Sequence, residues 1–294
     1  MSDISESSGR CCVVCGQSAA YSTLAELPFG KILRCSYCDV HSITPLPTVE
    51  QLIAAYQNFD AGEIARNEFN AYVEQAKDIL KSDLASSSLN VDHELKFLDY
   101  GCGGGHFVKA ASELGIAAWG IDLDEEDAKF GRIHGLRIAV GDFRNIDQLG
   151  PQTYNAILLM HVLEHVPHPA DVLTALIARL EPNGVLIIRV PDQSSVPSTI
   201  KRCLRRLGIK TKEWGFVQPP VHLHGYSTKT FEIIARLHHL DVVRLSKISP
   251  LDHDEFPTTD RYWQNLAIHK QVYRLGRIAG SGGHLVAILR RQSL

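Results

Sequence analysis

Residues 96 to 107, which read KFLDYGCGGGHF, constrain the fold of this chain more than any other segment. A short apolar run ends at Asp99, four glycines follow closely, and an amphipathic helical pattern begins at Phe107. Glycine has no Cβ and accepts positive φ, so a ligand can lie directly against such a turn and face the free amides of the helix N-terminus. The segment therefore predicts a strand, a tight turn and a helix that bind a nucleotide-like ligand.

The spacing of the glycines narrows the kind of ligand. A dinucleotide-binding turn requires G-x-G-x-x-G, but the sixth position here is His106. No lysine stands where G-x-x-x-x-G-K-[ST] would place one to hold phosphates. The pattern is instead D-x-G-x-G-x-G, and it starts at Asp99. This spacing favours a nucleoside-like ligand that carries no phosphate.

Three further strand-like runs follow, and each leads into polar residues. Residues 117 to 121 end at Asp122, which can accept both ribose hydroxyls of a nucleoside or cap the next helix. Residues 137 to 140 lead to Asp142, and residues 156 to 160 lead to the segment HVLEHVPHP. Strands that alternate with helical patterns predict a doubly wound α/β sheet whose strand ends meet along one edge.

In these motifs the chain resembles the class I S-adenosylmethionine (SAM)-dependent methyltransferases, over roughly residues 95 to 240. The resemblance implies a Rossmann-like sheet of seven strands with an antiparallel last strand, and SAM as the cofactor. In that family the acid at the Asp142 position accepts from the adenine amino group, and the next side chain lies against the ring. The implied cofactor-binding residues are Asp99, Gly101, Cys102, Gly103, Gly105, Asp122, Leu123, Asp142, Phe143 and Met160.

The segment after the fourth strand carries the candidate catalytic groups. If it forms a helical turn, His161, Glu164 and His165 lie close together, because positions three and four apart share a helix face. Methyl transfer from a sulfonium needs alignment and, for a hydroxyl or carbon nucleophile, removal of a proton. Histidine titrates near neutrality and a carboxylate can orient it, so His165 backed by Glu164 is the predicted base pair. Packing of the strand end, or contact with the cofactor, is the alternative role of this pair.

A metal-assisted alternative rests on the same segment. In some small-molecule and RNA O-methyltransferases a Glu-x-x-Glu-His segment at this place holds a divalent ion, whereas this chain has His161 at the first position. A hard ion such as Mg²⁺ prefers oxygen, so His161, Glu164, His165 and a distant histidine would better suit zinc or iron. Further along, in VHLHGYS, either His222 or His224 can bind substrate or supply the base, and we count His224 among the catalytic candidates.

Five of the seven cysteines fall in the first 38 residues. Cys12, Cys15, Cys35 and Cys38 match C-x₂-C-x₁₅₋₂₀-C-x₂-C, the spacing of a four-thiolate zinc ribbon. A pair of disulfides is the alternative, but the polar N-terminus has no signal-peptide character, which favours an intracellular chain with reduced thiols. We therefore expect a closed, structural Zn²⁺ site and a cytoplasmic protein.

The motifs divide the chain into three parts. We expect a zinc ribbon at 1–45, a helical cover and linker at 46–92, and a methyltransferase core at 93–294 with an insert at 193–221. The cover is expected to lie over the cofactor. A flap over the site is expected at 250–283.

Charge bears on the partners of this protein. The net charge of −3 and a pI near 6.5 argue against a nucleic-acid partner. Between residues 200 and 212, lysines and arginines are interleaved with apolar residues. That pattern is typical of a solvated lid helix, or of a helix that transiently contacts a membrane or an anionic substrate. The sequence does not predict an oligomeric state.

In its combination of a cysteine ribbon with this core, the chain is similar to the bacterial sugar methyltransferases that act on nucleotide-linked deoxysugars. Some of those enzymes methylate carbon with a Glu-His pair. Those enzymes carry an additional C-terminal domain of which only a short remnant fits here, so an O-methyltransferase is an equal expectation. The expected acceptor is a small molecule, namely a sugar, a nucleotide sugar or a secondary metabolite. The alternatives are a metal-assisted O-methyltransferase acting on RNA or a quinone-like lipid, and a SAM-binding scaffold without catalysis.

Overall fold

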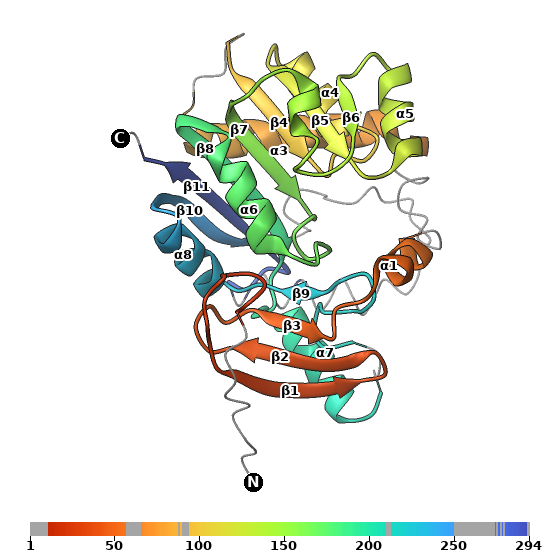
Figure 1. Cartoon of the computed structure of the whole chain (residues 1–294), viewed down its shortest axis with the longest axis vertical. Helices are drawn as coiled ribbons and strands as arrows, with labels where there is room; N and C mark the ends of the chain where they lie inside the picture. The colour runs from red at the N-terminus through yellow and green to blue at the C-terminus, as the bar shows by residue number, and fades with distance from the viewer. Residues whose placement is uncertain are drawn as a thin grey trace.

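In a computed structural model, the described part of the chain contains two β-sheets, a small one and a large one (Figure 1). The structure describes residues 11–56, 66–87, 89, 94–209, 213–249, 274, 276, 278 and 280–292. The small sheet has the strand order β1 (Tyr21–Leu27), β2 (Gly30–Cys35), β3 (His41–Thr44) and β9 (His224–Gly225). The large sheet has the order β10 (Leu240–Ile248), β11 (His284–Arg291), β8 (Leu180–Pro191), β7 (Tyr154–Met160), β4 (Lys96–Tyr100), β5 (Ala117–Asp122) and β6 (Ile138–Val140).

The large sheet has the predicted topology. Strands β8, β7, β4, β5 and β6 are parallel, and β11 runs antiparallel to both of its neighbours. The order reverses at β4, so the ends of β4 and β7 meet at the point where doubly wound sheets bind their ligands. The predicted α/β fold with seven strands and an antiparallel last strand is confirmed.

Alternation along the central strands divides the core into two layers. In β7, Ile157 and Leu159 pack into one apolar cluster while Leu158 packs into the other, because successive side chains of a strand point to opposite faces. The first cluster lies under α6 (Pro169–Ala178) and α8 (Thr228–Leu237). The second lies under α3 (Phe69–Ser87), α4 (His106–Glu113) and α5 (Glu125–Ile133). In Figure 1, α6 is in front of the sheet and α3 is behind it.

Helix α3 belongs to this layer of the core, and the expectation that residues 46–92 cover the cofactor stays a prediction. Its buried face packs on α4 and the sheet, and Asp83 forms two 2.9 Å hydrogen bonds with Arg189 of β8. Both side chains of this ion pair are fully buried. The shorter helix α1 (Val49–Tyr56) places Leu52 against the small sheet instead. The boundary at residue 93 stays a prediction.

The small sheet is joined to the core. Strand β9 comes from the core sequence and pairs antiparallel with β3, so that His41 lies opposite Gly225 and Ser42 opposite His224. In Figure 1, β9 is the strand of the small sheet nearest the large sheet. An apolar cluster combines residues of the ribbon with residues of the insert, namely Leu27, Ile32, Ile43, Trp214, Val217 and Leu223. The ribbon and the insert therefore share one core.

The insert begins with helix α7 (Val196–Arg206), and its basic residues already have partners inside the protein. Arg202 donates to the carbonyl oxygen of Gln193 at 2.6 Å, and Lys201 lies 3.6 Å from a carboxylate oxygen of Glu213. Residues 210–212 lie outside the described part of the chain, as does most of the expected flap at 250–283. Among the described residues, no helix combines the length and apolar character needed to cross a bilayer.

Candidate active site

The glycine turn lies between β4 and α4 and packs directly under the segment that follows β7. Gly101 has φ +77°, and a Cβ added there would lie 2.5 Å from Val162 Cγ2. Gly105 is the N-cap of α4 with φ +88°, and a Cβ there would lie 2.6 Å from Ile138 Cδ1. Both positions combine positive φ with a close approach, so they require glycine. The cradle expected from the sequence is therefore present.

Two acids define the polar side of this cradle. Asp99 is 1% exposed, and its Oδ1 has no hydrogen-bond partner among the described residues. Burial, and secondarily the charge of Asp122, raises the pKa of Asp99 well above its ordinary value. A cationic ligand beside Asp99 would stabilise its charged form. SAM carries two positive groups, a sulfonium and an ammonium, so the residues present fit it.

Asp122 ends β5 and organises the turn. Its Oδ2 accepts from the amide of Gly103 at 2.7 Å, and its Oδ1 accepts from the amide of Asp124 at 2.8 Å. Burial raises the pKa of Asp122 despite these bonds. The N-cap of α5 is Asp124, whose Oδ1 accepts from Glu126 and Asp127. The helix-capping alternative for Asp122 is thus taken by its neighbour, and the second lone pairs of Asp122 can still accept ribose hydroxyls.

The predicted adenine-end residues lie at the end of β6, and they differ in exposure. Both carboxylate oxygens of Asp142 accept from Arg144 Nε at 3.0 Å, and this partner lowers the pKa of Asp142. Phe143 is half-buried against the core, whereas Leu123 is 75% exposed. A ligand amino group would therefore compete with Arg144 for Asp142.

Cys102 and Met160 are predicted cofactor residues whose side chains pack in the apolar core. Cys102 is buried, and a Cβ on Gly120 would lie 2.6 Å from its sulfur. Burial also raises the pKa of Cys102. Met160 packs against the cluster under α3, α4 and α5. The backbone of Cys102 lies in the turn, but its side chain packs against the sheet.

The segment after β7 forms a turn at residues 163–165 and no helix. His161 has φ +55°, in the left-handed region, and its amide donates to the carbonyl oxygen of Arg189 at 2.9 Å. The chain then bends back, and the amide of His165 donates to the carbonyl oxygen of Val162. The bend still brings His161 Nδ1 to 3.1 Å from Glu164 Oε1. Glu164 is thus oriented by His161 from its own turn.

His222 lies beside Glu164 and His165 and completes their cluster. The sequence left open whether His222 or His224 would be near this site. The ring centroids of His165 and His222 are 4.6 Å apart. His165 Nδ1 donates to the carbonyl oxygen of Val221 at 3.2 Å, and His222 Nδ1 donates to that of Phe216 at 3.1 Å. One donor atom each from Glu164, His165 and His222 lies within 4.8 Å of the others. Because a carbonyl only accepts, the lone pair of each neutral ring is on Nε2.

His224, the other predicted catalytic candidate of this segment, lies outside the cluster of Glu164, His165 and His222. Its Nε2 donates to the carbonyl oxygen of Val166 at 3.0 Å, and its Nδ1 accepts from Ser42 Oγ at 2.8 Å. Both ring nitrogens are used inside the protein. In VHLHG the two histidines are two residues apart, so a regular strand would place both on the same face, and the sequence alone does not separate them.

His284 is a neighbour of the site that gave no signal in the sequence. It lies at the start of β11, and its ring centroid is 4.7 Å from that of His161. The two residues are far apart in the chain, and no motif links them.

The charges of the cluster are set by burial and by mutual contact. Burial by itself would raise the pKa of Glu164, but the hydrogen bond from His161 and the nearby histidines lower it to about 2. Burial lowers the pKa of His165 to about 4, and it also lowers that of His222. At neutral pH the cluster is therefore one carboxylate and neutral imidazoles. Glu164 Oε2 has no hydrogen-bond partner among the described residues.

The four ribbon cysteines meet as their spacing predicted. All are buried, and one sulfur from each lies within 4.8 Å of the others. Thiol hydrogen bonds, above all with Cys15, lower the pKa of Cys12 to about 7. Contacts with the other thiols, Cys12 first, lower the pKa of Cys35 as well. Four buried sulfurs that lie this close together fit a tetrahedral zinc ion, which binds cysteine as the thiolate.

A doubly wound seven-stranded sheet with a glycine cradle at the reversal point, and with the buried Asp99 and half-buried Asp122 beside it, defines a class I SAM-dependent methyltransferase. The chain belongs to the methyltransferase domain family, whose model matches residues 66–245. SAM is accordingly its cofactor.

Similar curated proteins are named for oxygen methylation. A ubiquinone biosynthesis O-methyltransferase of Photobacterium profundum is 29% identical over 174 residues, which are 57% of this chain and 71% of that protein. One of Bordetella pertussis is 39% identical over 95 residues, which are 30% of this chain and 39% of that protein. The chain thus spans about two fifths of this second relative.

A solved structure shares the fold. The plantazolicin methyltransferase BamL, in complex with an analogue and SAH, matches with a TM-score of 0.52 and 13% identity. The match covers 83% of this chain and 96% of that one. At this identity the likeness concerns the fold alone.

Proposed function

We propose that this protein transfers the methyl group of SAM to a hydroxyl oxygen of a small molecule, with His165 as the base that removes the hydroxyl proton. The observation that carries this proposal is the cluster of Glu164, His165 and His222, because Glu164 and His165 belong to the same turn as Val162, which packs against the cofactor cradle. Relatives named for O-methylation favour oxygen over carbon. A sugar, a nucleotide sugar, a secondary metabolite and a quinone-like lipid are the acceptor classes to compare.

Bound SAM would supply an activated methyl group, and the protein supplies position and a proton acceptor. The glycine cradle and Asp99 would hold the charged end of the cofactor, and Asp122 the ribose. Val221 accepts the Nδ1 proton of His165, so the lone pair of this ring is on Nε2. Glu164 beside it would stabilise the imidazolium that forms when the proton is taken.

An acceptor panel tests this proposal. Purified full chain is incubated with SAM and, separately, a quinol-type phenol, nucleotide sugars or free sugars, and SAH release is measured. We expect turnover with a hydroxyl acceptor, and a methyl ether as the product. A product methylated on carbon, or SAM binding by calorimetry without turnover on any acceptor, would contradict it.

Metal-assisted O-methylation is the second candidate, and one observation favours it. Glu164 Oε2 is buried without a partner among the described residues, while a carboxylate and two neutral imidazoles together form a ligand set for a transition metal. Metal analysis separates the two candidates. A second metal ion per chain that is lost in His222→Ala, while the ribbon metal stays, would favour the metal-assisted enzyme.

Two further expectations stay proposals. We propose that the ribbon cysteines bind one structural zinc ion, which metal analysis of Cys35→Ser would test by a loss of about one equivalent. We also propose a cytoplasmic location. The contact of residues 200–212 with a membrane or an anionic substrate is a prediction, and the partners of Arg202 and Lys201 within the insert weaken it.

A further inference from the structure

Strand β3 of the ribbon holds the short segment that carries His222. The segment is residues 221–225, and its last two residues form β9, which pairs with β3. The amide of Ile43 in β3 also donates to the carbonyl oxygen of Leu223 at 3.1 Å. The ribbon thus contributes one complete side of this segment.

The opposite side of the segment is held by the turn at residues 161–165, which we call the catalytic turn because it carries the proposed base. Glu164 accepts on its carbonyl oxygen from the amides of Leu223 at 2.7 Å and His224 at 3.2 Å. His165 Nδ1 donates to the carbonyl oxygen of Val221. Residues 221–225 therefore lie between the ribbon and the two residues proposed to act on the acceptor.

His224 links the ribbon to the turn through its side chain. Its ring bridges Ser42 Oγ of β3 and the carbonyl oxygen of Val166, and it is 1% exposed. Because the carbonyl oxygen of Val166 can only accept, Nε2 of His224 carries the proton, and its Nδ1 accepts the hydroxyl hydrogen of Ser42. This geometry fixes both partners to one tautomer of His224.

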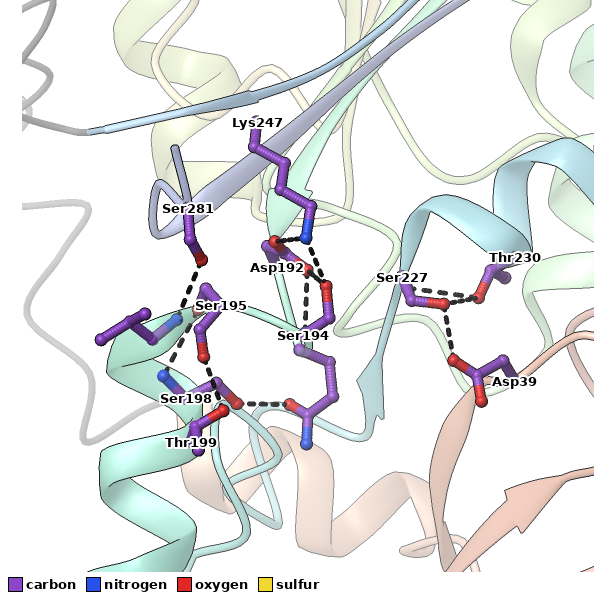
Figure 2. A network of polar contacts seen from close by, with 12 residues as sticks. Asp39, Asp192, Ser194, Ser195, Ser198, Thr199, Ser227, Thr230, Lys247 and Ser281 are labelled. Atoms are coloured by element: carbon purple, nitrogen blue, oxygen red, sulfur yellow. Dashed lines mark hydrogen bonds and ion pairs between the residues drawn. The ribbon is translucent and has the colours of Figure 1, made fainter. Parts of the chain in front are cut away.

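A second bridge starts at His41 of β3. Gln193 Nε2 donates to His41 Nδ1 at 2.9 Å, and Gln193 Oε1 accepts from the amide of Phe216 at 3.2 Å. Phe216 in turn accepts from His222 Nδ1. Figure 2 shows a third link, in which Ser227 Oγ donates to Asp39 Oδ2 at 2.9 Å, directly after the last ribbon cysteine.

The cofactor cradle is held by the large sheet. The amides of Gly101 and Cys102 donate to the carbonyl oxygen of Ile121 in β5, and Asp122 holds Gly103. The two halves of the site thus have different supports.

We propose that the loaded cysteine ribbon is a positioning element for the acceptor half of the site, acting through Ser42, His224 and Gln193. With its metal bound, β3 keeps residues 221–225 against the catalytic turn so that His222 faces His165. When the metal is removed, this segment loosens while the cradle still binds SAM. This inference rests on the proposed zinc ion and, for the role of the acceptor half, on the proposed function; the hydrogen bonds between β3 and residues 223–225 do not depend on either.

Hydrogen exchange measured by mass spectrometry on the full chain tests this coupling. Zinc-loaded protein is compared with protein treated with a zinc chelator, and SAM affinity is measured by calorimetry on both. We expect exchange at the amides of Leu223 and His224 to accelerate by about tenfold or more, with SAM affinity changed less than about twofold. Unchanged protection of these amides after complete metal loss would overturn the proposal.

A variant with intact cysteines covers the case in which metal removal unfolds the chain. Ser42→Ala should accelerate exchange at residues 221–225 and leave SAM affinity unchanged, whereas Ser42→Thr, which keeps the hydroxyl, should restore protection. Lys31→Ala is the matched control, because this exposed side chain in β2 pairs only loosely with Glu26 at 3.8 Å. Equal exchange in Ser42→Ala and Lys31→Ala, or a parallel loss of SAM affinity in Ser42→Ala, contradicts the proposal. Because exchange is read without an acceptor, this result is independent of whether His165 is a base.

Discussion

The cofactor half and the acceptor half of the active site are built in different ways. The cradle and its two acids come from β4, β5 and the turns that follow them, within residues 99–124. The acceptor half combines the turn at 161–165 with residues 213–227 and is supported by the ribbon. A local motif therefore binds the cofactor, whereas long-range packing assembles the groups that act on the acceptor. Changes in the two halves should have separable effects.

The largest difference between the effect on turnover and the effect on SAM affinity is expected from His165→Ala. Loss of the base should reduce turnover by roughly 10²–10⁴-fold, because proton transfer by a positioned side chain contributes about this much. SAM affinity should stay the same, since His165 lies outside the cradle. Steady-state kinetics with calorimetry would measure both, and exposed His168 in the same loop gives the control variant His168→Ala. Turnover near that of the wild type would exclude His165 as the base.

Gly101→Ala should damage the cofactor half instead. Its methyl group would enter the space of Val162 at a positive φ, and we expect SAM affinity to fall by about tenfold to a hundredfold. Gly135→Ala is a matched control, because Gly135 also has φ +77° but a Cβ there meets nothing within 4 Å. Calorimetry on both variants separates the close contact from the backbone strain. Equal SAM affinities would show that the Val162 contact does not matter.

Asp122→Ala should weaken SAM binding by about tenfold. The variant removes the acceptor proposed for the ribose and releases the amide of Gly103, and a hydrogen bond to a charged group contributes about 1.5–3 kcal/mol. Asp124→Ala removes only the helix cap, so it should cost about 1 kcal/mol of stability with little change in affinity. If the two variants bound SAM equally well, the ribose assignment would be wrong.

The smallest expected effect concerns pH and is shared by both halves. Burial lowers the pKa of His106, beside the cradle, to about 4, as it does for His165. Between about pH 6.5 and pH 4 the unfolded chain binds the proton and the folded chain does not, so stability is complete above this window and falls as the pH falls through it.

Removal of one such histidine should make the free energy of unfolding depend less steeply on pH. In His106→Leu we expect the loss of unfolding free energy per pH unit to be smaller by about 1 kcal/mol within the window. Urea unfolding at several pH values would measure the slope, with exposed His168→Ala as the control. An unchanged slope in His106→Leu would show that His106 does not titrate in this way.

The sequence by itself determined the cofactor half and the ribbon. Glycine spacing, an acid at each strand end and the distance between two C-x-x-C pairs are local properties, since positive φ, strand ends and thiol knuckles each depend on a few adjacent residues. The order of alternating strands and helices also fixed the sheet, because parallel strands need crossovers and these follow a common hand. The predicted fold was therefore correct, including its antiparallel last strand.

Only the tertiary structure decided the acceptor half. It brings the ring of His222 beside that of His165, whereas both ring nitrogens of His224 bond to Ser42 and Val166. It also places α3 against the sheet, where Asp83 meets Arg189 in the core. These outcomes depend on contacts between residues far apart in the chain. Their energies come from burial and pairing in the folded state, which no local pattern of residues records.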